Sequence, residues 1–276
     1  MMATIRYTRA FPSVNHGLTE RMVEAPERMN PEEYEKLAAI DRDHWFYAGK
    51  RAIVRHWIAR YRPLAATDVL LDAGMGTGAW LLTMARQCRI IGLDDYEESL
   101  RIAQPLVEAT GGRAIKTGLD HVDLPAATAS VVTLLDVLEH LDDDASALRE
   151  MVRLTRPGGL IVITVPALQM LWSDWDEVLH HRRRYSRSQL LGLVRATPGV
   201  ELLHCAYTNT FSLLPIALIR MWRRLVPLKP GAARMEDRIP APWLNRILYR
   251  LYVTPACAAW WHPPAGVSLL AVLRRK

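Results

Sequence analysis

The stretch LLDAGMGTGAW, residues 70–80, decides the fold. Its apolar start predicts a buried strand, which is followed by a glycine-rich turn and by a helix that begins near Ala79. Gly74, Gly76 and Ala79 match the pattern G-x-G-x-x-G/A, in which glycines let the backbone approach the pyrophosphate of a dinucleotide. The stretch therefore predicts a site for a nucleotide-like ligand and leaves open which ligand it is.

Strands and helices alternate downstream of this turn. Helices are expected at 79–87, 97–109, 143–155 and 187–196. Short apolar strands are expected at 68–73, 89–94, 113–118, 130–137, 159–166, 200–207 and 267–275. We expect the last two strands to pair antiparallel. This alternation predicts an α/β, Rossmann-like, seven-stranded and mostly parallel sheet with helices on both faces.

Additions surround this core and suggest four segments. Residues 1–66 are expected to form an N-terminal arm and a helical cover, with helices starting at Pro31 and spanning 45–61. The core occupies 67–209. Residues 210–265 separate two strands that a short hairpin could join, so we expect a helical lid insertion with helices near 211–226 and 243–259. Residues 266–276 supply the final strand and a basic tail.

Composition limits the functional classes. Hydrophobic residues make up 50% of the 276-residue chain, and the formal net charge is +6. These values indicate a globular protein. The positive charge is concentrated at 182–184, 220–224 and 274–276, which suits an anionic substrate, a membrane surface, or a solvated face. A nucleic-acid partner is not expected, because no separate binding module is visible.

The cysteines and the uncharged segments bear on location. Cys88, Cys205 and Cys257 are odd in number and far apart, which argues against a disulfide framework or a zinc site and fits a reducing, cytoplasmic environment. Residues 1–18 contain no apolar signal region. Residues 253–273 carry no charge, but prolines and a glycine interrupt any helix there, so we expect no membrane span. Peripheral membrane contact through the insertion stays open.

Further motifs accompany the glycine turn in a fixed order. Asp94 ends the second strand, where a carboxylate can bind both hydroxyls of an adenosine ribose. Asp120 follows the third strand in DHVDLP, and Asp136 follows the fourth in LLDVLEHLDD. Together with RLTRPGGLIVITVP and with the D-x-G-x-G-x-G pattern that begins at Asp72, they resemble the class I S-adenosylmethionine-dependent methyltransferases over residues 67–166. A dehydrogenase is the alternative interpretation.

The resemblance implies a cofactor site for S-adenosylmethionine, with S-adenosylhomocysteine as product. Asp94 would bind the ribose and Asp120 the adenine amine, while Asp72 would act near the methionine end. The complete set of expected cofactor residues is Asp72, Gly74, Gly76, Gly78, Asp94, Asp120 and Asp136. The sequence departs from the family pattern at Leu119, where a glycine is usual, and at Val132, where an aspartate is common.

Segments outside the core are similar to a bacterial subgroup of the same superfamily. They are DHWFYAGKR at 43–51, HHRRRYSRSQL at 180–190 and YTNTFSLLPIALIR at 207–220. The subgroup acts on varied small metabolites and on glycan or lipid precursors, so the resemblance implies a small-molecule acceptor without naming it. A lipid-linked acceptor at the membrane face and a catalytically idle binding protein are the alternatives.

Candidate catalytic residues follow from the chemistry of a hydroxyl acceptor. A base must take the proton of such an acceptor, and histidine suits this role near neutral pH. His140 follows the fourth strand, and His181 and Tyr185 follow the fifth. Helix capping for His140 and a basic surface loop for the other two are the structural alternatives.

Four more residues are expected near the acceptor. Arg184 offers an anion contact, and Trp222 belongs to the aromatic and cationic insertion. His44 and Trp45 could close over the site or pack in the core. No metal ion is expected, because the three acids of LDDDA at 141–145 suit a helix N-terminus.

Overall fold

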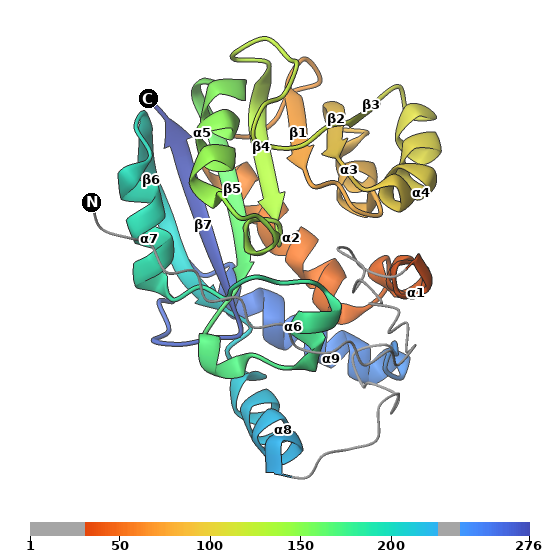
Figure 1. The fold of residues 1–276 in the computed structure, drawn as a ribbon, viewed down its shortest axis with the longest axis vertical. Helices are drawn as coiled ribbons and strands as arrows, with labels where there is room; N and C mark the ends of the chain where they lie inside the picture. The colour runs from red at the N-terminus through yellow and green to blue at the C-terminus, as the bar shows by residue number, and fades with distance from the viewer. Residues whose placement is uncertain (1–30, 226–237) are drawn as a thin grey trace, which may run out of the picture.

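The computed structural model describes residues 31–225 and 238–276. A seven-stranded sheet in the order β3-β2-β1-β4-β5-β7-β6 organises this part of the chain (Figure 1). Neighbouring strands from β3 to β5 are parallel, and β7 runs antiparallel to both β5 and β6. The prediction of a mostly parallel, Rossmann-like sheet with an antiparallel final pair is confirmed. The strands are β1 (Val69–Ala73), β2 (Arg89–Asp94), β3 (Arg113–Lys116), β4 (Ala129–Leu135), β5 (Thr155–Pro166), β6 (Val200–Thr208) and β7 (Ser268–Arg275).

Two layers of helices bury the two faces of the sheet. One layer contains α2 (Trp45–Tyr61), α3 (Ala79–Met84), α4 (Glu97–Glu108) and α9 (Pro242–Ala256), whose apolar side chains form one buried cluster with the sheet. The other layer contains α5 (Asp144–Leu154) and α7 (Arg187–Ala196), which belong to a second cluster. The apolar strands are therefore covered on both sides, as a parallel sheet requires.

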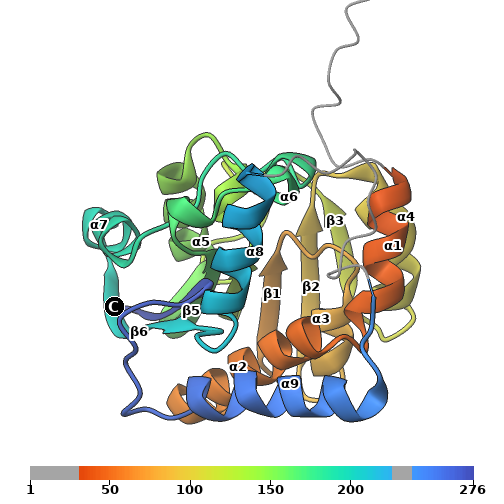
Figure 2. The ribbon, with the colours of Figure 1, turned by 90° about the horizontal axis from the view of Figure 1, so that it is seen from below.

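The predicted insertion at 210–265 divides into two different structures. Helix α9 lies beside α2 (Figure 2), and the indole Nε1 of Trp57 donates a 3.0 Å hydrogen bond to the carbonyl oxygen of Ala256. Tyr252 of α9 is buried, so this helix is part of the sheet cover rather than of a lid. Helix α8 (Leu213–Leu225) instead extends away from the sheet.

Helix α8 exposes much of its apolar surface. Leu214 and Trp222 are 70% and 63% exposed, and Leu218 and Met221 are exposed as well. Within residues 31–225 and 238–276, none of the helices is long and apolar enough to cross a membrane.

The start of β5 differs from the prediction. The sequence places a Pro-Gly-Gly turn before a strand at 159–166, whereas β5 begins at Thr155. Thr155 pairs with Ala129 across an irregularity in the register between β4 and β5. Gly158 takes a φ of +73°, so the expected turn is absorbed as a distortion inside the strand.

Short elements gather at the carboxyl ends of the parallel strands, where ligands of such sheets bind (Figures 1 and 2). They are α1 (Pro31–Asp41), the 3-10 turn η1 (Leu138–His140), the 3-10 turn η2 (Gln169–Leu171) and α6 (Asp174–Val178). Helix α1 contacts α4 through an ion pair of 2.9 Å between Glu35 and Arg101. The N-terminal arm predicted at 1–30 lies outside the described residues.

Candidate active site

The glycine turn between β1 and α3 depends on three left-handed residues. Gly74, Gly76 and Gly78 have φ values of +76°, +52° and +75°. A Cβ at Gly74 would lie 2.6 Å from Cγ2 of Val137, which is closer than real side chains come. Both the backbone conformation and the lack of space therefore require glycine at position 74.

Asp94 connects this turn to the end of β2. Its carboxylate accepts hydrogen bonds of 3.0 Å from the backbone N–H groups of Gly76 and Tyr96. Burial raises the pKa of Asp94 above its ordinary value, although these hydrogen bonds oppose the shift. A carboxylate in this place is poorly solvated and can accept further hydrogen bonds, as the two hydroxyls of a ribose would supply.

The other expected cofactor acids lie at different depths. Asp72 is buried at the end of β1 and accepts a 2.6 Å hydrogen bond from Oγ1 of Thr133. Burial raises the pKa of Asp72 well above its ordinary value. Asp120 is exposed in the loop after β3, where a Cβ at Gly118 would lie 3.0 Å from its Oδ1. The buried acid can position the turn, and the exposed acid is free to contact a ligand.

These features fit an adenosine-containing cofactor. A Cβ would clash at Gly74 and would be tight at Gly78, and a half-buried acid, Asp94, stands at the end of the neighbouring strand. Tyr34, on α1, lies next to the turn, because a Cβ at Gly76 would be 3.5 Å from its hydroxyl oxygen. Helix α1 thus covers the glycine turn.

A second group of polar residues surrounds the ends of β4 and β5. Asp136 has a left-handed φ of +57° and accepts a 2.9 Å hydrogen bond from Oγ1 of Thr164. Its other carboxylate oxygen pairs with the ammonium of Lys50, on α2. Lys50 is buried, and desolvation lowers its pKa to about 8.

Sequence reasoning missed Lys50. A signal was present, because this lysine stands among apolar residues in WFYAGKRAIV, on the face of α2 that also buries Ile53 and Trp57. A lysine on a buried helix face needs a partner. The sequence did not show that the partner is Asp136, which is far along the chain.

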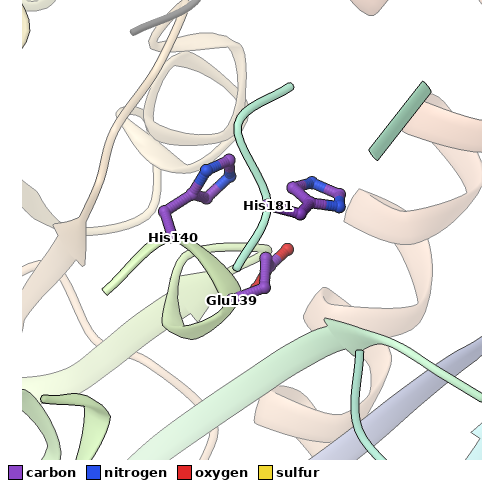
Figure 3. A group of neighbouring side chains, drawn as sticks. All are labelled: Glu139, His140 and His181. Carbon is purple, nitrogen blue, oxygen red and sulfur yellow. The ribbon is translucent and has the colours of Figure 1, made fainter. Parts of the chain in front are cut away.

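Glu139, His140 and His181 lie together beside this pair (Figure 3). The centroids of the two imidazole rings are 4.9 Å apart. Burial raises the pKa of Glu139 to about 8. Burial, with a contribution from neighbouring His181, lowers the pKa of His140 to about 4, so this imidazole is neutral at pH 7.

Asp176 organises the segment that carries His181. Its fully buried carboxylate is hydrogen bonded to Nδ1 of His181 at 2.9 Å and accepts a 2.6 Å bond from Nε of Arg184. Burial opposes ionisation, but these two hydrogen bonds prevail and lower the pKa of Asp176 to about 2. Sequence reasoning missed this residue because it resembles an ordinary helix-capping acid; it does cap α6, by accepting from the backbone N–H of Ser173 at 2.9 Å.

The structure thus brings His140 and His181 together and places two other expected residues elsewhere. The guanidinium of Arg184 is buried against Asp176 and the carbonyl oxygen of Ala167. Tyr185 is buried in the hydrophobic core, and its hydroxyl donates a 2.6 Å hydrogen bond to Asp144. Arg184 therefore positions the His181 segment, and the hydroxyl of Tyr185 is directed toward α5.

Two of the three remaining expected acceptor residues have structural contacts. His44 is buried and caps α2 by accepting a 3.3 Å hydrogen bond from the backbone N–H of Phe46. Trp45 packs against Phe211, with ring centroids 5.6 Å apart. Trp222 is exposed on α8 and is not grouped with the buried cluster.

A sequence profile described as "Methyltransferase domain" matches residues 71–163. This range contains the glycine turn, Asp94, Asp136, Glu139 and His140. The resemblance to the class I S-adenosylmethionine-dependent methyltransferases is confirmed over this part of the chain. The methyltransferase core therefore coincides with the part of the sheet from β1 to β5.

Curated methyltransferase relatives share this core at low identity. The ubiquinone biosynthesis O-methyltransferase of Sodalis glossinidius is 28% identical over 163 residues, which are 54% of this chain and 64% of that protein. The protein of the same name from Yersinia pestis is 29% identical over 149 residues, 48% of this chain and 62% of its own length. The chain thus spans less than two thirds of these relatives.

Solved methyltransferase structures have the same fold. An S-adenosylmethionine-dependent methyltransferase from Thermotoga maritima aligns with a TM-score of 0.57 and 15% identity, over 89% of this chain and 95% of its own. Geranyl diphosphate methyltransferase aligns with a TM-score of 0.54 and 14% identity, over 81% and 85% of the two chains. The cyclase SpnF aligns with a TM-score of 0.53 and 20% identity, over 81% of each chain. The fold therefore also occurs in a protein named for a different reaction.

Proposed function

We propose that this protein transfers the methyl group of S-adenosylmethionine to a hydroxyl oxygen of a small-molecule acceptor. The observation that carries the proposal is the half-buried carboxylate of Asp94, hydrogen bonded to the glycine turn at the carboxyl end of β2. Two curated relatives named O-methyltransferases support oxygen as the acceptor atom.

The residues around the glycine turn would hold the cofactor. Asp94 would accept hydrogen bonds from the ribose hydroxyls, and Asp120 would accept one from the adenine amine. The left-handed backbone at Gly74 and Gly76 would let N–H and C=O groups approach the ligand closely. When bound, S-adenosylmethionine supplies a methyl group that its sulfonium makes electrophilic, so the protein mainly has to orient the acceptor and exclude water.

The residues at the ends of β4 and β5 would act on the acceptor. A hydroxyl must lose its proton to the protein or to water as the oxygen attacks. His140 presents a neutral imidazole for this purpose, and the ammonium of Lys50 can stabilise negative charge on the oxygen. His181, which Asp176 orients, completes the polar wall on this side.

Methyl-labelled S-adenosylmethionine tests the proposal. The purified protein is incubated with the labelled cofactor, a panel of phenols, catechols and alcohols, and a cell extract of the source organism. We expect label in a small product that alkali does not hydrolyse, as an ether requires. Label only in amines or esters, or no transfer by a protein that binds S-adenosylhomocysteine, would contradict the proposal. The last result would favour a binding protein without catalysis.

The exposed apolar side chains of α8 favour a second candidate, in which the acceptor is lipid-linked. Leu214, Leu218 and Trp222 could enter a lipid surface and bring the site to its acceptor. Co-sedimentation with anionic phospholipid vesicles, and its loss in Leu218→Asp, are expected in that case. Equal sedimentation of the two proteins would remove this candidate.

A further inference from the structure

The cluster of Glu139, His140 and His181 contains a buried carboxylate that has no partner. Glu139 is 0% exposed, and neither of its carboxylate oxygens has a hydrogen bond within the described part of the chain. A buried carboxylate without hydrogen bonds is costly, so it normally binds a proton, a cation or a donor. The imidazoles of His140 and His181 lie next to this carboxylate (Figure 3).

Nearby cations do not fill this role, because each has its own carboxylate. Lys50 pairs with Asp136, Arg184 with Asp176, and Arg182 with Asp142. Across the residues described here, no ion pair reaches Glu139. The position next to Glu139 is therefore left for a cation that no described residue provides.

The imidazole of His181 is already oriented by an acceptor. His181 is hydrogen bonded through Nδ1 to Asp176, which leaves its Nε2 available. An acceptor that fixes one ring nitrogen and leaves the other to a ligand is the usual arrangement around metal-binding histidines.

The distances suit one shared ion. A nitrogen or oxygen donor from each of the three side chains lies within 4.8 Å of the others. Donors around a transition-metal ion lie about 3 to 4 Å apart, since each is about 2.1 Å from the ion. A small contraction of the cluster would therefore bring all three donors to one ion.

We propose that Glu139, His140 and His181 bind one divalent transition-metal ion. Two imidazoles and one carboxylate favour zinc, cobalt, iron or manganese over magnesium or calcium, which prefer oxygen donors. Three protein ligands leave coordination positions open for water or for a substrate oxygen. The acids at 142–144 take no part in this site. It is therefore a different site from residues 141–145, where the sequence predicts no metal ion.

A role in the reaction rests on the proposed function. An ion at this place would bind the acceptor oxygen and lower the pKa of its hydroxyl, whose proton would leave to water. The oxygen would then form its bond to the methyl carbon while the carbon–sulfur bond breaks and its electron pair stays on sulfur. His140 would serve as a ligand to the ion instead of as a base.

Titration with Co²⁺ tests metal binding independently of catalysis. The full-length protein is treated with chelator, dialysed and titrated with Co²⁺, and the visible ligand-field absorption is recorded. We expect one equivalent to bind and the absorption to be lost in Glu139→Gln and in His140→Ala. His121→Ala, which removes an exposed histidine, is the matched control and should bind as the wild type does. Circular dichroism confirms that each variant is folded.

A variant of Asp176, which orients His181, gives a second test. Asp176→Asn is expected to weaken Co²⁺ binding about 10- to 100-fold and to shift the absorption bands, because His181 loses its carboxylate partner. If chelator-treated protein binds no stoichiometric Co²⁺, or if Glu139→Gln and His140→Ala bind it as the wild type does, the metal site is wrong. S-adenosylhomocysteine binding, measured on the same samples, shows separately whether the cofactor site is intact.

Discussion

The two halves of the candidate site depend on different kinds of chemical groups. At the ends of β1 and β2, the cofactor half consists of a left-handed backbone turn and one acid, Asp94, that is hydrogen bonded to it. At the ends of β4 and β5, the acceptor half consists of buried charged side chains. The first half depends on shape and backbone groups, while the second depends on charges that compensate one another.

This difference has consequences for substitution. A side chain added to the cofactor half occupies space that the ligand or the backbone needs. A side chain removed from the acceptor half leaves a buried charge without its partner, because Lys50 and Asp176 each hold other groups in place. The two halves should therefore respond differently in ligand binding and in stability.

The largest effect is expected at the glycine turn. Gly74→Val places a branched side chain at a φ of +76° and against Val137, so binding of S-adenosylhomocysteine should fall by more than about 100-fold and stability should drop as well. Calorimetric titration and thermal unfolding measure the two effects. Gly111→Ala is the control, since it shares a positive φ of +80° but meets no atom within 4 Å. Equal behaviour of the two variants would show that the turn is not part of a ligand site.

A smaller effect is expected when only the acid is changed. Asp94→Asn keeps the size of the side chain but removes the charge that would accept from ribose hydroxyls. Binding of S-adenosylhomocysteine should weaken about 10- to 100-fold, which is the usual cost of about 1.5 to 3 kcal/mol for hydrogen bonds to a charged group. Asp95→Asn, at the adjacent exposed acid, should bind within about threefold of the wild type. Normal binding by Asp94→Asn would contradict the role of Asp94 in the cofactor half.

The acceptor half should show the opposite pattern. Lys50→Met keeps the length of the side chain but leaves Asp136 without its ion pair, so the free energy of unfolding should fall by about 1 to 3 kcal/mol. Methyl transfer should also fall, while S-adenosylhomocysteine should bind within about threefold of the wild type. Chemical denaturation and titration measure these quantities. A large loss of cofactor binding in this variant would mean that the two halves are not separate.

A buried histidine outside both halves should contribute to the acid sensitivity of the fold. His204, on β6, stacks on Trp57 at 3.8 Å, and burial lowers its pKa to about 4. Its folded pKa is depressed below the unfolded value of about 6.5, so the unfolded chain binds the proton more readily between these values. Stability should therefore be retained above pH 6.5 and decrease as the pH falls toward 4, by about 2 kcal/mol at pH 5.

His204→Phe isolates this contribution. The substitution keeps a ring against Trp57 and removes the titrating group, so the variant should lose less stability than the wild type between pH 7 and pH 5. Denaturant unfolding at several pH values measures the difference. Parallel curves for the two proteins would show that the acid sensitivity arises elsewhere. His140, whose pKa is also lowered, would then be the next residue to substitute.

The sequence allowed the sheet and the cofactor half to be predicted because both are encoded locally. Strand and helix periodicity predicted α2 and α7 at their observed bounds, and the spacing of Gly74, Gly76 and Gly78 follows from the geometry of one turn. The predicted start of β5 was wrong because its first residues form a strand only through their irregular pairing with β4. Local sequence does not express such a pairing.

The acceptor half could be predicted only in part. His140 and His181 could be named as histidines that follow strands, but their meeting depends on the path of the loop after β5. Lys50, Glu139 and Asp176 gain their significance from burial and from one another, which no local pattern expresses. Arg184 was expected at the substrate for its charge, whereas tertiary packing commits that charge to Asp176.

Calorimetric titration of S-adenosylhomocysteine into the wild type, Asp94→Asn and Lys50→Met tests the central claim most directly. The account predicts stoichiometric binding to the wild type, a loss of about 10- to 100-fold in Asp94→Asn and little change in Lys50→Met. Failure of the wild type to bind, or equal affinity in the wild type and Asp94→Asn, would contradict the assignment of the glycine turn and Asp94 to the cofactor.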